Sequence, residues 1–303
     1  MIKHFDTSVP NSARVWNFWM GGKDYYDADH RAGDAYRVIA PQIDTIVREA
    51  RRFRVRAVTL LAAELGVRQF LDIGTGMPVD IGDRQSVNTD SRLPVADNTH
   101  EVAQRVAPAA RIVYVDNDPN VINHIRALSI GTREGRVAAV NADLHAPDTV
   151  LAAAHDHLDF SQPVALMLMG VLGHVEDHAA ATAIVRRLTA DLPAGSYFVY
   201  SDRTDTDSAL AKAQDNYNHI ADVLPYVLRS PAQLATFHHG LTLLDPGIVS
   251  CPRWRPDPDT EAPAEIDIYG GVSLKQFGGT AQLTGLTVQA HSIPCPGTER
   301  TSA

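Results

Sequence analysis

Three aspartates stand where apolar runs of the sequence end, and their carboxylates can do the chemistry of ligand recognition. The runs end at Asp72, Asp116 and Asp143. Parallel strands bring their carboxyl ends to one edge of a sheet, so these acids are expected to lie close together. There Asp116 can accept both hydroxyls of a ribose, and Asp143 the exocyclic amine of an adenine with Leu144 packed on the ring. Together they predict a site for adenosine joined to an amino acid, although each aspartate alone fits the commoner role of helix N-cap.

A glycine-rich turn, Gly74-Thr75-Gly76, follows the first of these acids. Glycine at such a turn allows a positive φ and a close approach between the chain and a ligand. A dinucleotide-binding loop would carry a third glycine, where this chain has Val79. This difference, together with the acid before the turn, disfavours a nicotinamide-dependent oxidoreductase, which remains an alternative.

Apolar runs alternate with segments of helical pattern, which predicts an α/β domain with a doubly wound parallel sheet. The expected parallel strands are residues 70–73, 111–116, 137–142, 163–170 and 197–202. The fourth is apolar throughout, as a central strand with both faces covered should be. Helices are expected at 12–20, with Ser12 as its cap, and at 41–65, with Gly66 ending it.

Several short motifs resemble those of one protein family. The Asp-x-Gly-x-Gly pattern at 72–76 is similar to motif I of S-adenosylmethionine-dependent methyltransferases. Further motifs are SARVWNFWMGGKD at 12–24, NTHEVA at 98–103, GVLGHVED at 170–177, PAGS at 193–196 and YGGV at 269–272. Together they resemble a family of actinobacterial S-adenosylmethionine-dependent methyltransferases formerly classed as a domain of unknown function, over about residues 12–276.

The resemblance implies a Rossmann-like class I fold. This is a seven-stranded, mostly parallel sheet with an antiparallel last strand, helices on both faces and extra N-terminal helices. Residues 241–249 and 266–274 would then form the closing antiparallel pair. The implied cofactor is S-adenosylmethionine, with Asp72 orienting its ammonium group. The expected cofactor contacts are Gly21, Gly22, Lys23, Asp72, Gly74, Thr75, Gly76, Asp116, Asn117, Asp143, Leu144, Gly170 and Val171.

Methyl transfer by in-line displacement needs an acceptor held along the S–CH₃ bond, and proximity supplies part of the rate. A hydroxyl or ammonium acceptor also needs a base, whereas a free amine does not. His174, after the fourth strand, is the candidate base because an imidazole titrates near neutral pH. Asp202, at the end of the fifth strand, is a second candidate. Packing or capping near a helix start explains both residues equally well.

Aromatic residues around a paired-glycine turn are the candidates for the acceptor side. Because Gly21, Gly22 and Lys23 interrupt the aromatic cluster, we expect this segment to close over the cofactor, although core packing is the commoner role of such rings. The candidate acceptor contacts are Trp16, Trp19, Tyr25 and Tyr26 in this segment, with Asn216 and Tyr217 further along.

The chain is expected to have three parts. Residues 1–66 form an N-terminal helical cap, residues 67–276 the cofactor-binding domain and residues 277–303 a flexible tail. Within the domain, residues 79–94 are rich in turn formers and predict an inserted loop beside the pocket. Residues 203–230 are too long for a simple connection and predict a helical insertion over the pocket. The expected solvated face of the 41–65 helix carries Arg48, Arg51, Arg52, Arg54 and Arg56.

Composition argues against several other classes of protein. The net charge of −9, from 27 basic and 36 acidic residues, disfavours binding to nucleic-acid backbones. Cys251 and Cys295 suggest neither a disulfide framework nor a metal site, and the pair His174 and His178 lacks further ligands, so no metal is expected. Without a signal pattern or an apolar run of membrane length, we expect a cytoplasmic protein with no membrane partner.

These observations favour methyl transfer to an oxygen or nitrogen atom of a small molecule, in the manner of specialised metabolism. A protein acceptor, and a protein that binds S-adenosylmethionine without catalysis, are the alternatives. Neither the acceptor nor the oligomeric state follows from the sequence.

Overall fold

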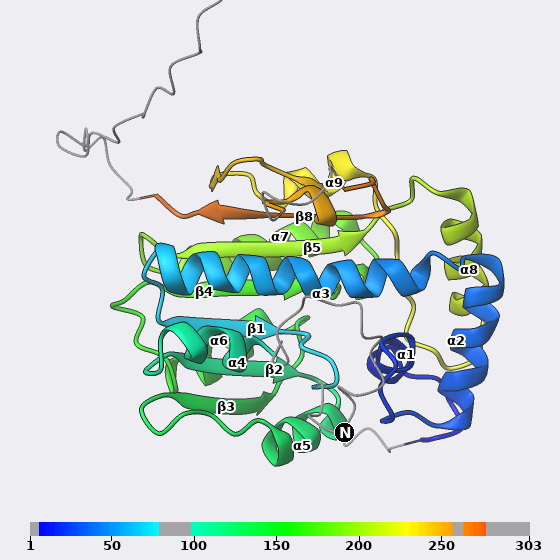
Figure 1. Cartoon of the computed structure of the whole chain (residues 1–303), viewed down its shortest axis with the longest axis horizontal. Helices are drawn as coiled ribbons and strands as arrows, with labels where there is room; N and C mark the ends of the chain where they lie inside the picture. Colours follow the sequence, from blue (N-terminus) through cyan, green and yellow to red (C-terminus); the bar gives the residue numbers. More distant parts are fainter. Residues whose placement is uncertain (1–5, 79–97, 257–262, 277–303) are drawn as a thin grey trace, which may run out of the picture.

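A single mixed sheet organises the molecule. The computed structural model of the 303-residue chain describes residues 6–78, 98–256 and 263–276. Its strands are β1 (Gln69–Ile73), β2 (Arg111–Asp116), β3 (Arg136–Asn141), β4 (Ala165–Met169), β5 (Tyr197–Arg203), β6 (Thr242–Leu243), β7 (Val249–Ser250) and β8 (Ile268–Leu274). They follow the order β3-β2-β1-β4-β5-β8-β6, with β7 also paired to β8. The predicted Rossmann-like α/β class is confirmed (Figure 1).

The first five strands are parallel, and their alternation feeds two cores. Phe70 and Ile112 point to one face of the sheet, whereas Leu71 and Val113 point to the other. Strand β1 pairs with β2 on one side and β4 on the other, so all five of its residues are buried. This placement explains the near-continuous apolar runs from which the strands were predicted.

The closing strands differ in number from the prediction. Strand β8 runs antiparallel to β5 and separates it from β6. Residues 241–249 do not form one strand, because Pro246 and Gly247, the latter with φ of +88°, interrupt the pairing and leave the two-residue strands β6 and β7. The described sheet therefore has eight strands instead of seven.

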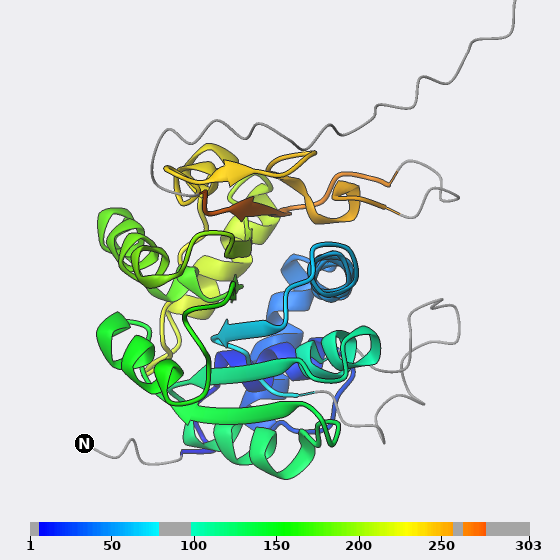
Figure 2. The same cartoon turned by 90° about the vertical axis from the view of Figure 1, so that its left-hand side faces the viewer.

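Helices cover both faces of the sheet, as Figure 2 shows. One face carries α3 (Ile43–Thr59), α4 (Thr99–Val106) and α5 (Pro119–Leu128), and the other carries α6 (Pro147–His155) and α7 (His178–Asp191). Beyond the carboxyl ends of the strands lie α1 (Ser12–Trp19), α2 (Asp27–Ile39) and α8 (Ser208–Asn218), on the right in Figure 1. The short helix α9 (Pro231–Thr236) precedes β6.

The N-terminal helices start and end somewhat differently from the prediction. Asn11, not Ser12, is the cap of α1, because its Oδ1 accepts hydrogen bonds from the backbone N–H of Ala13 and Arg14 at 2.9 and 3.3 Å. The helix predicted at 41–65 is α3 followed by a π-helical turn at Leu60–Glu64.

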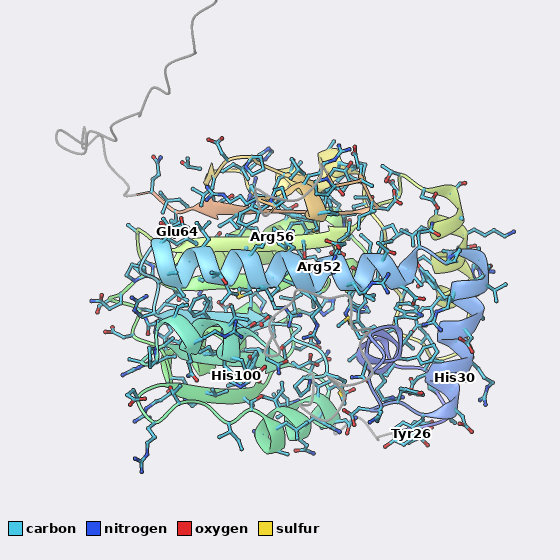
Figure 3. The ribbon with its side chains drawn as sticks, viewed as in Figure 1. Tyr26, His30, Arg52, Arg56, Glu64 and His100 are labelled. Atoms are coloured by element: carbon cyan, nitrogen blue, oxygen red, sulfur yellow. The ribbon has the colours of Figure 1, made fainter. Side chains whose placement is uncertain are left out.

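The arginines of α3 do not share a solvated face. Arg48 is exposed, and Arg52 pairs with Glu49. In contrast, Arg51 is only 4% exposed, and Arg56 donates to the backbone carbonyl of Cys251 at 2.6 Å. The prediction fails because α1, α4, β8 and the turn Cys251–Arg253 all pack on α3, which removes part of its arginine face from water. Arg52 and Arg56 are labelled in Figure 3.

Two predicted segments, the insertion at 79–94 and the tail at 277–303, lie outside the described residues. Within the described part of the chain, no helix has the length and apolar character required to cross a membrane.

Candidate functional site

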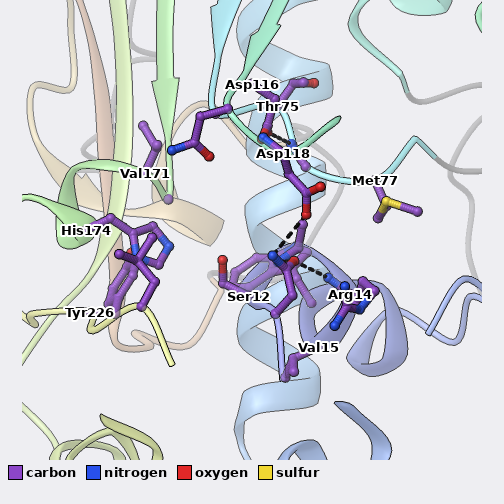
Figure 4. A pocket seen from close by; sticks show the side chains of 18 of the residues that line it. Ser12, Arg14, Val15, Thr75, Met77, Asp116, Asp118, Val171, His174 and Tyr226 are labelled. Atoms are coloured by element: carbon purple, nitrogen blue, oxygen red, sulfur yellow. Dashed lines mark hydrogen bonds between the residues drawn. The ribbon is translucent and has the colours of Figure 1, made fainter. Parts of the chain in front are cut away.

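A cavity of about 790 Å³ lies at the carboxyl ends of the parallel strands. Loops after β1, β2, β3 and β4 form one wall, and α1, β5 and α8 contribute to the other. Figure 4 shows Thr75, Asp116 and Asp118 on one side of it, His174 and Tyr226 on another, and Ser12, Arg14 and Val15 of α1 below. This is the volume range of cavities that hold small-molecule ligands, roughly 300–1,000 Å³.

The loop after β1 presents its backbone to the cavity. Gly74 has a φ of +69°, and a Cβ there would lie 2.2 Å from Cγ2 of Val171. Gly76 has a φ of +66°, and its N–H donates to Oδ2 of Asp116 at 3.2 Å. The glycines thus allow the β1 and β4 loops to meet and leave Thr75 between them on the cavity wall.

Asp116 lies at the tip of β2 and lines the cavity. Burial raises the pKa of Asp116 to about 6, although backbone N–H donors from Asp118 and Gly76 favour the ionised form. Asp118 caps α5 by accepting the N–H of Asn120 at 2.8 Å. Of the two acids, Asp118 therefore has the N-cap role, and Asp116 faces the cavity.

The loop after β3 supplies a more exposed acid. Asp143 lines the cavity, and Asn117 donates to its Oδ2 at 3.3 Å. Burial alone would raise the pKa of Asp143, but hydrogen bonds from His145 and Asn117 outweigh it and lower the pKa. Leu144 is 7% exposed and also lines the cavity. The predicted adenine end therefore has an acceptor beside an apolar surface.

Asp72 does not belong to the cavity wall. Because it alternates with Leu71 and Ile73, its side chain lies on the sheet face covered by α3 and α4. There Thr99 donates to its Oδ2 at 2.6 Å, and Asp72 is only 2% exposed. Burial raises the pKa of Asp72, which Arg54 and Arg51 partly oppose.

Arg54 reaches the cavity from α3, together with Arg51. The two are three residues apart and so share one face of the helix. The Nε of Arg54 is buried and has no hydrogen-bond partner within the described structure. An arginine donor, with the carboxylate of Asp72 behind it, thus stands at the β1 end of the cavity.

The segment before and within α1 crosses the cavity and is fixed at both ends. Arg14 forms a buried ion pair with Asp29, with 2.7 Å between Nε and Oδ2. Nδ2 of Asn11 donates to Oδ2 of Asp118 at 3.0 Å, which joins α1 to the start of α5. Trp16 and Trp19 both line the cavity, and Trp19 also donates to the carbonyl of Gly33 at 3.1 Å.

The predicted turn after α1 lies away from the cavity. Gly21, Gly22 and Lys23 do not line it; the N–H groups of Gly21 and Gly22 bond to the last carbonyls of α1, which makes them a helix C-cap. A Cβ at Gly22 would meet the side chain of Asn17 at 2.3 Å, so helix closure accounts for this glycine without a ligand.

Tyr25 and Tyr26 are also outside the cavity wall. Tyr25 packs against Phe18 and His30, and Tyr26 is 42% exposed beside Arg14 (Figure 3). Core packing, the alternative considered for these rings, describes Tyr25.

His174 forms the other end of the cavity, after β4. Its Nδ1 is 2.9 Å from the carbonyl oxygen of Pro225, and its ring stands edge-on to Tyr226 with centroids 4.9 Å apart. A carbonyl can only accept, so Nδ1 carries the hydrogen and the neutral imidazole has its lone pair on Nε2. His174 therefore has the tautomer that a general base at Nε2 requires.

Asp202 is buried behind this end of the cavity. Alternation along β5 turns Ser201 and Arg203 toward the cavity and Asp202 away from it. Tyr226 donates its hydroxyl to Oδ1 of Asp202, and burial raises the pKa of Asp202 to about 6 despite the charge of Arg203. Asp202 can therefore act on a ligand only through Tyr226 or Arg203.

Helix α8 completes this end of the cavity. Gln214 and Tyr217 are three residues apart and line the cavity, whereas Asn216 is exposed on another face of the helix. Tyr217 thus lies where it was predicted, and Asn216 does not.

The chain was compared with known families and structures. A model of the S-adenosyl methyltransferase family matches residues 1–82 and 79–276. The chain belongs to this family. A crystal structure of a DUF574 family protein from Streptomyces avermitilis is 40% identical, with a TM-score of 0.77, and the match covers 89% of this chain and 99% of that one. A candidate methyltransferase from Thermobifida fusca is 33% identical, with a TM-score of 0.76, over 90% and 97% of the two chains. A comparison with curated proteins gave no match.

The family settles the general activity of this S-adenosyl methyltransferase. It is an S-adenosylmethionine-dependent enzyme, not a nicotinamide-dependent oxidoreductase, and S-adenosylmethionine is its cofactor. The residues present fit that group, because Gly74 with its Cβ-free approach, Asp116 with a buried carboxylate at the tip of β2, and Arg54 with an unpartnered Nε all line one cavity.

His174 and His178, the pair that was considered and rejected as metal ligands, contact different neighbours in the S-adenosyl methyltransferase. His178 bonds through Nε2 to Oγ1 of Thr236 at 3.0 Å, outside the cavity, while His174 bonds to Pro225. Among the residues that the structure describes, no group of three or more metal-ligating side chains is suited to hold a metal ion.

Sequence reasoning missed several residues that line the cavity, namely Asn11, Arg14, Arg51, Arg54, Arg203, Gln214 and Tyr226. For two of these residues the sequence does contain a signal. Arg203 follows the predicted strand end with the alternation that turns it toward the ligand, and Gln214 lies one helical turn before Tyr217. Tyr226 lies in a segment without regular structure and gave no such signal.

Proposed function

We propose that this enzyme methylates an oxygen or nitrogen atom of a small molecule by in-line displacement, with His174 as general base. When bound, S-adenosylmethionine supplies a methyl group on a sulfonium, whose S–CH₃ bond breaks as the bond to the acceptor forms. The proton of a hydroxyl or ammonium acceptor passes to Nε2 of His174. A free amine needs no such transfer.

The loops after β1 to β4 are the proposed cofactor side. We assign the ribose to Asp116 with Asn117 beside it, and the adenine to Asp143 and Leu144. Gly74, Thr75, Gly76, Gly170 and Val171 form the surface on which the rest of the cofactor lies. Arg54 is a further proposed contact, because a guanidinium is a good donor to the carboxylate of the amino-acid end. Asp72 then acts as a positioning residue near Arg54.

The acceptor is proposed to lie between α1, α8 and the segment before α9. Trp16, Trp19 and Tyr217 line this end and offer aromatic surfaces to a flat ligand. Asp202 is proposed to position Tyr226, since it accepts a hydrogen bond from the Tyr226 hydroxyl. The ring of Tyr226 in turn stands against His174.

One observation carries the proposal. The hydrogen bond from Nδ1 of His174 to the carbonyl of Pro225, at 2.9 Å, sets the basic tautomer of a histidine that shares its cavity with Asp116. A histidine that merely packed or capped a helix would not need to face the same cavity as the cofactor loops.

The test begins with calorimetry of S-adenosylhomocysteine binding, followed by release of S-adenosylhomocysteine from S-adenosylmethionine with a panel of phenols and amines. His174→Gln should lower kcat with a phenol by about 10²- to 10⁴-fold. Its affinity for S-adenosylhomocysteine and its turnover of amines presented as free bases should stay close to wild type.

His178→Gln is the matched control, because His178 lies outside the cavity. The base assignment fails if both histidine variants turn over phenols like the wild type. The small-molecule proposal fails if a cofactor-binding enzyme methylates only protein acceptors.

A further inference from the structure

The acceptor end of the cavity contains a buried arginine without an ion pair. Arg203, the last residue of β5, is only 6% exposed and lines the cavity. Its Nη1 donates to the hydroxyl of Tyr36 at 3.1 Å, but its Nε has no hydrogen-bond partner. No carboxylate of the described residues forms an ion pair with its guanidinium. Such a charge is costly to bury unless something compensates it.

The charges around Arg203 do not supply that compensation directly. Asp202 is the nearest acid in sequence, but its carboxylate accepts from the hydroxyl of Tyr226 and from the backbone N–H of Arg203, not from the guanidinium. Asp29 is occupied by Arg14 at 2.7 Å. The Nε–H of Arg203 is therefore buried without an acceptor from the described residues.

A second unused donor belongs to Tyr217 on α8. Tyr217 lines the same cavity, and its hydroxyl is buried and has no hydrogen-bond partner in the described structure. Burial raises the pKa of Tyr217, so the hydroxyl stays protonated and can donate. The charge of Asp29 raises the pKa of Tyr217 further, whereas the charges of Arg203 and Arg14 lower it, so both guanidinium groups act on this hydroxyl.

Aromatic rings surround these donors. The guanidinium carbon of Arg203 lies 4.2 Å from the ring centroid of Tyr226 and 5.9 Å from that of Trp16. Cation–π contacts hold the guanidinium in place while leaving its edge, where Nε–H lies, for a planar acceptor. Trp16 and Tyr226 also provide a surface for a flat ring next to that edge.

We propose that the methyl acceptor is an aromatic carboxylic acid whose carboxylate is bound by Nε–H of Arg203 and the hydroxyl of Tyr217. Two donors suit the two oxygens of a carboxylate, and charge-assisted hydrogen bonds are stronger than neutral ones. The atom that receives the methyl group is a hydroxyl or amine elsewhere on the same molecule, near His174. This inference rests on the proposed function and specifies its substrate class.

The experiment is calorimetry on the full chain saturated with S-adenosylhomocysteine. The probes are benzoate, 4-hydroxybenzoate and indole-3-acetate, each compared with its neutral amide. At least one acid should bind about tenfold or more tightly than its amide. Arg203→Met should remove this preference, and Tyr217→Phe, which deletes only the hydroxyl, should reduce it several-fold. Both variants should keep the wild-type affinity for S-adenosylhomocysteine.

Asn216→Ala is the control on α8, because Asn216 is exposed and outside the cavity wall. If wild-type protein does not bind S-adenosylhomocysteine, the proposed function itself fails. If it binds but no acid is preferred over its amide, or the preference survives in Tyr217→Phe and in folded Arg203→Met, the carboxylate inference alone is overturned. Should Arg203→Met fail to fold, Tyr217→Phe decides the question.

Discussion

The two ends of the cavity are built in different ways. The proposed cofactor end comes from loops directly after four consecutive parallel strands, with Gly74 and Gly76 among its residues. The proposed acceptor end comes from α1, β5, α8 and the segment around Tyr226. A surface held by the register of a sheet has little freedom to vary, whereas one assembled from helix side chains can change residue by residue.

The two ends also differ in charge. Asp116 and Asp143 line the proposed cofactor end and are the acceptors that we assign to ribose and adenine, whereas Arg203 and His174, the proposed base, line the proposed acceptor end. Substitutions at the cofactor end should therefore change the affinity for S-adenosylhomocysteine, and those at the acceptor end should leave it unchanged.

Gly74→Ala should have the largest effect. The new Cβ would meet Cγ2 of Val171 at 2.2 Å, at a φ of +69° that disfavours alanine. We expect a loss of about 2–5 kcal/mol of unfolding free energy and no measurable S-adenosylhomocysteine binding. Gly21→Ala is the matched control, since Gly21 has a φ of +78° with nothing within 4 Å of a Cβ, and should cost only about 1 kcal/mol. Urea denaturation and calorimetry measure both, and equal losses in the two variants would contradict the role of the Val171 contact.

Asp116→Asn should weaken S-adenosylhomocysteine binding by about 10- to 100-fold, because ribose hydroxyls lose an ionised acceptor. The pKa of Asp116 is raised to about 6, so wild-type affinity should fall as pH drops below that value, while the Asn variant should show no such fall. Asp143→Asn should lose less affinity for S-adenosylhomocysteine, because the side chain of Asp143 is 48% exposed. Calorimetry from pH 5 to 8 measures this, and a pH-independent wild type would refute the ribose assignment.

Without ligand, the pKa of Asp116 has the opposite consequence for stability. Because burial raises it above the unfolded value of 3.8, its contribution to stability is fully present below that value and is lost as pH rises through about 6. Asp116→Asn should therefore raise the melting temperature of the ligand-free protein at pH 7.5 and leave it nearly unchanged at pH 4.

Tyr226→Phe tests the acceptor end with a smaller change. It removes the hydroxyl that donates a hydrogen bond to Asp202. The free energy of unfolding should fall by about 1–3 kcal/mol at pH 7.5, since a buried carboxylate loses a partner. The cost should shrink below about pH 6, where Asp202 becomes protonated. Affinity for S-adenosylhomocysteine should not change. Tyr269→Phe is the control, because its hydroxyl bonds to Glu265 at the surface, and a similar cost there would contradict the importance of burial.

Asn11→Ala should have the smallest effect, and this effect should reach both ends of the cavity. It removes the cap of α1 and the bond to Asp118, at a cost of about 1 kcal/mol in unfolding free energy. S-adenosylhomocysteine affinity should also fall a few-fold. Ser230→Ala removes the cap of α9, far from the cavity, and should lower only stability. Unchanged affinity in Asn11→Ala would show that the Asn11–Asp118 bond does not shape the site.

The residues predicted from strand ends reach the cavity wall more often than those predicted from the aromatic segment, for a physical reason. Asp116 and Gly74 each stand at or directly after the end of a strand. A short sequence pattern is therefore enough to predict where each of them lies. The acceptor end joins Trp16, Arg203 and Tyr226, which no local pattern connects. Gly21 and Gly22 misled the prediction because a helix C-cap and a ligand-binding turn demand the same backbone freedom. The buried arginines of α3 were missed because amphipathicity does not reveal how many elements pack on one helix.

The pairing of α2 with α8 has a consequence for how such enzymes diversify. The two helices pack on each other, and α8 places Gln214 and Tyr217 at the cavity, outside the β-sheet, whereas α2 does not line it. We expect relatives to differ at these α8 positions, because a substitution there leaves the strands and the loops that follow them unchanged.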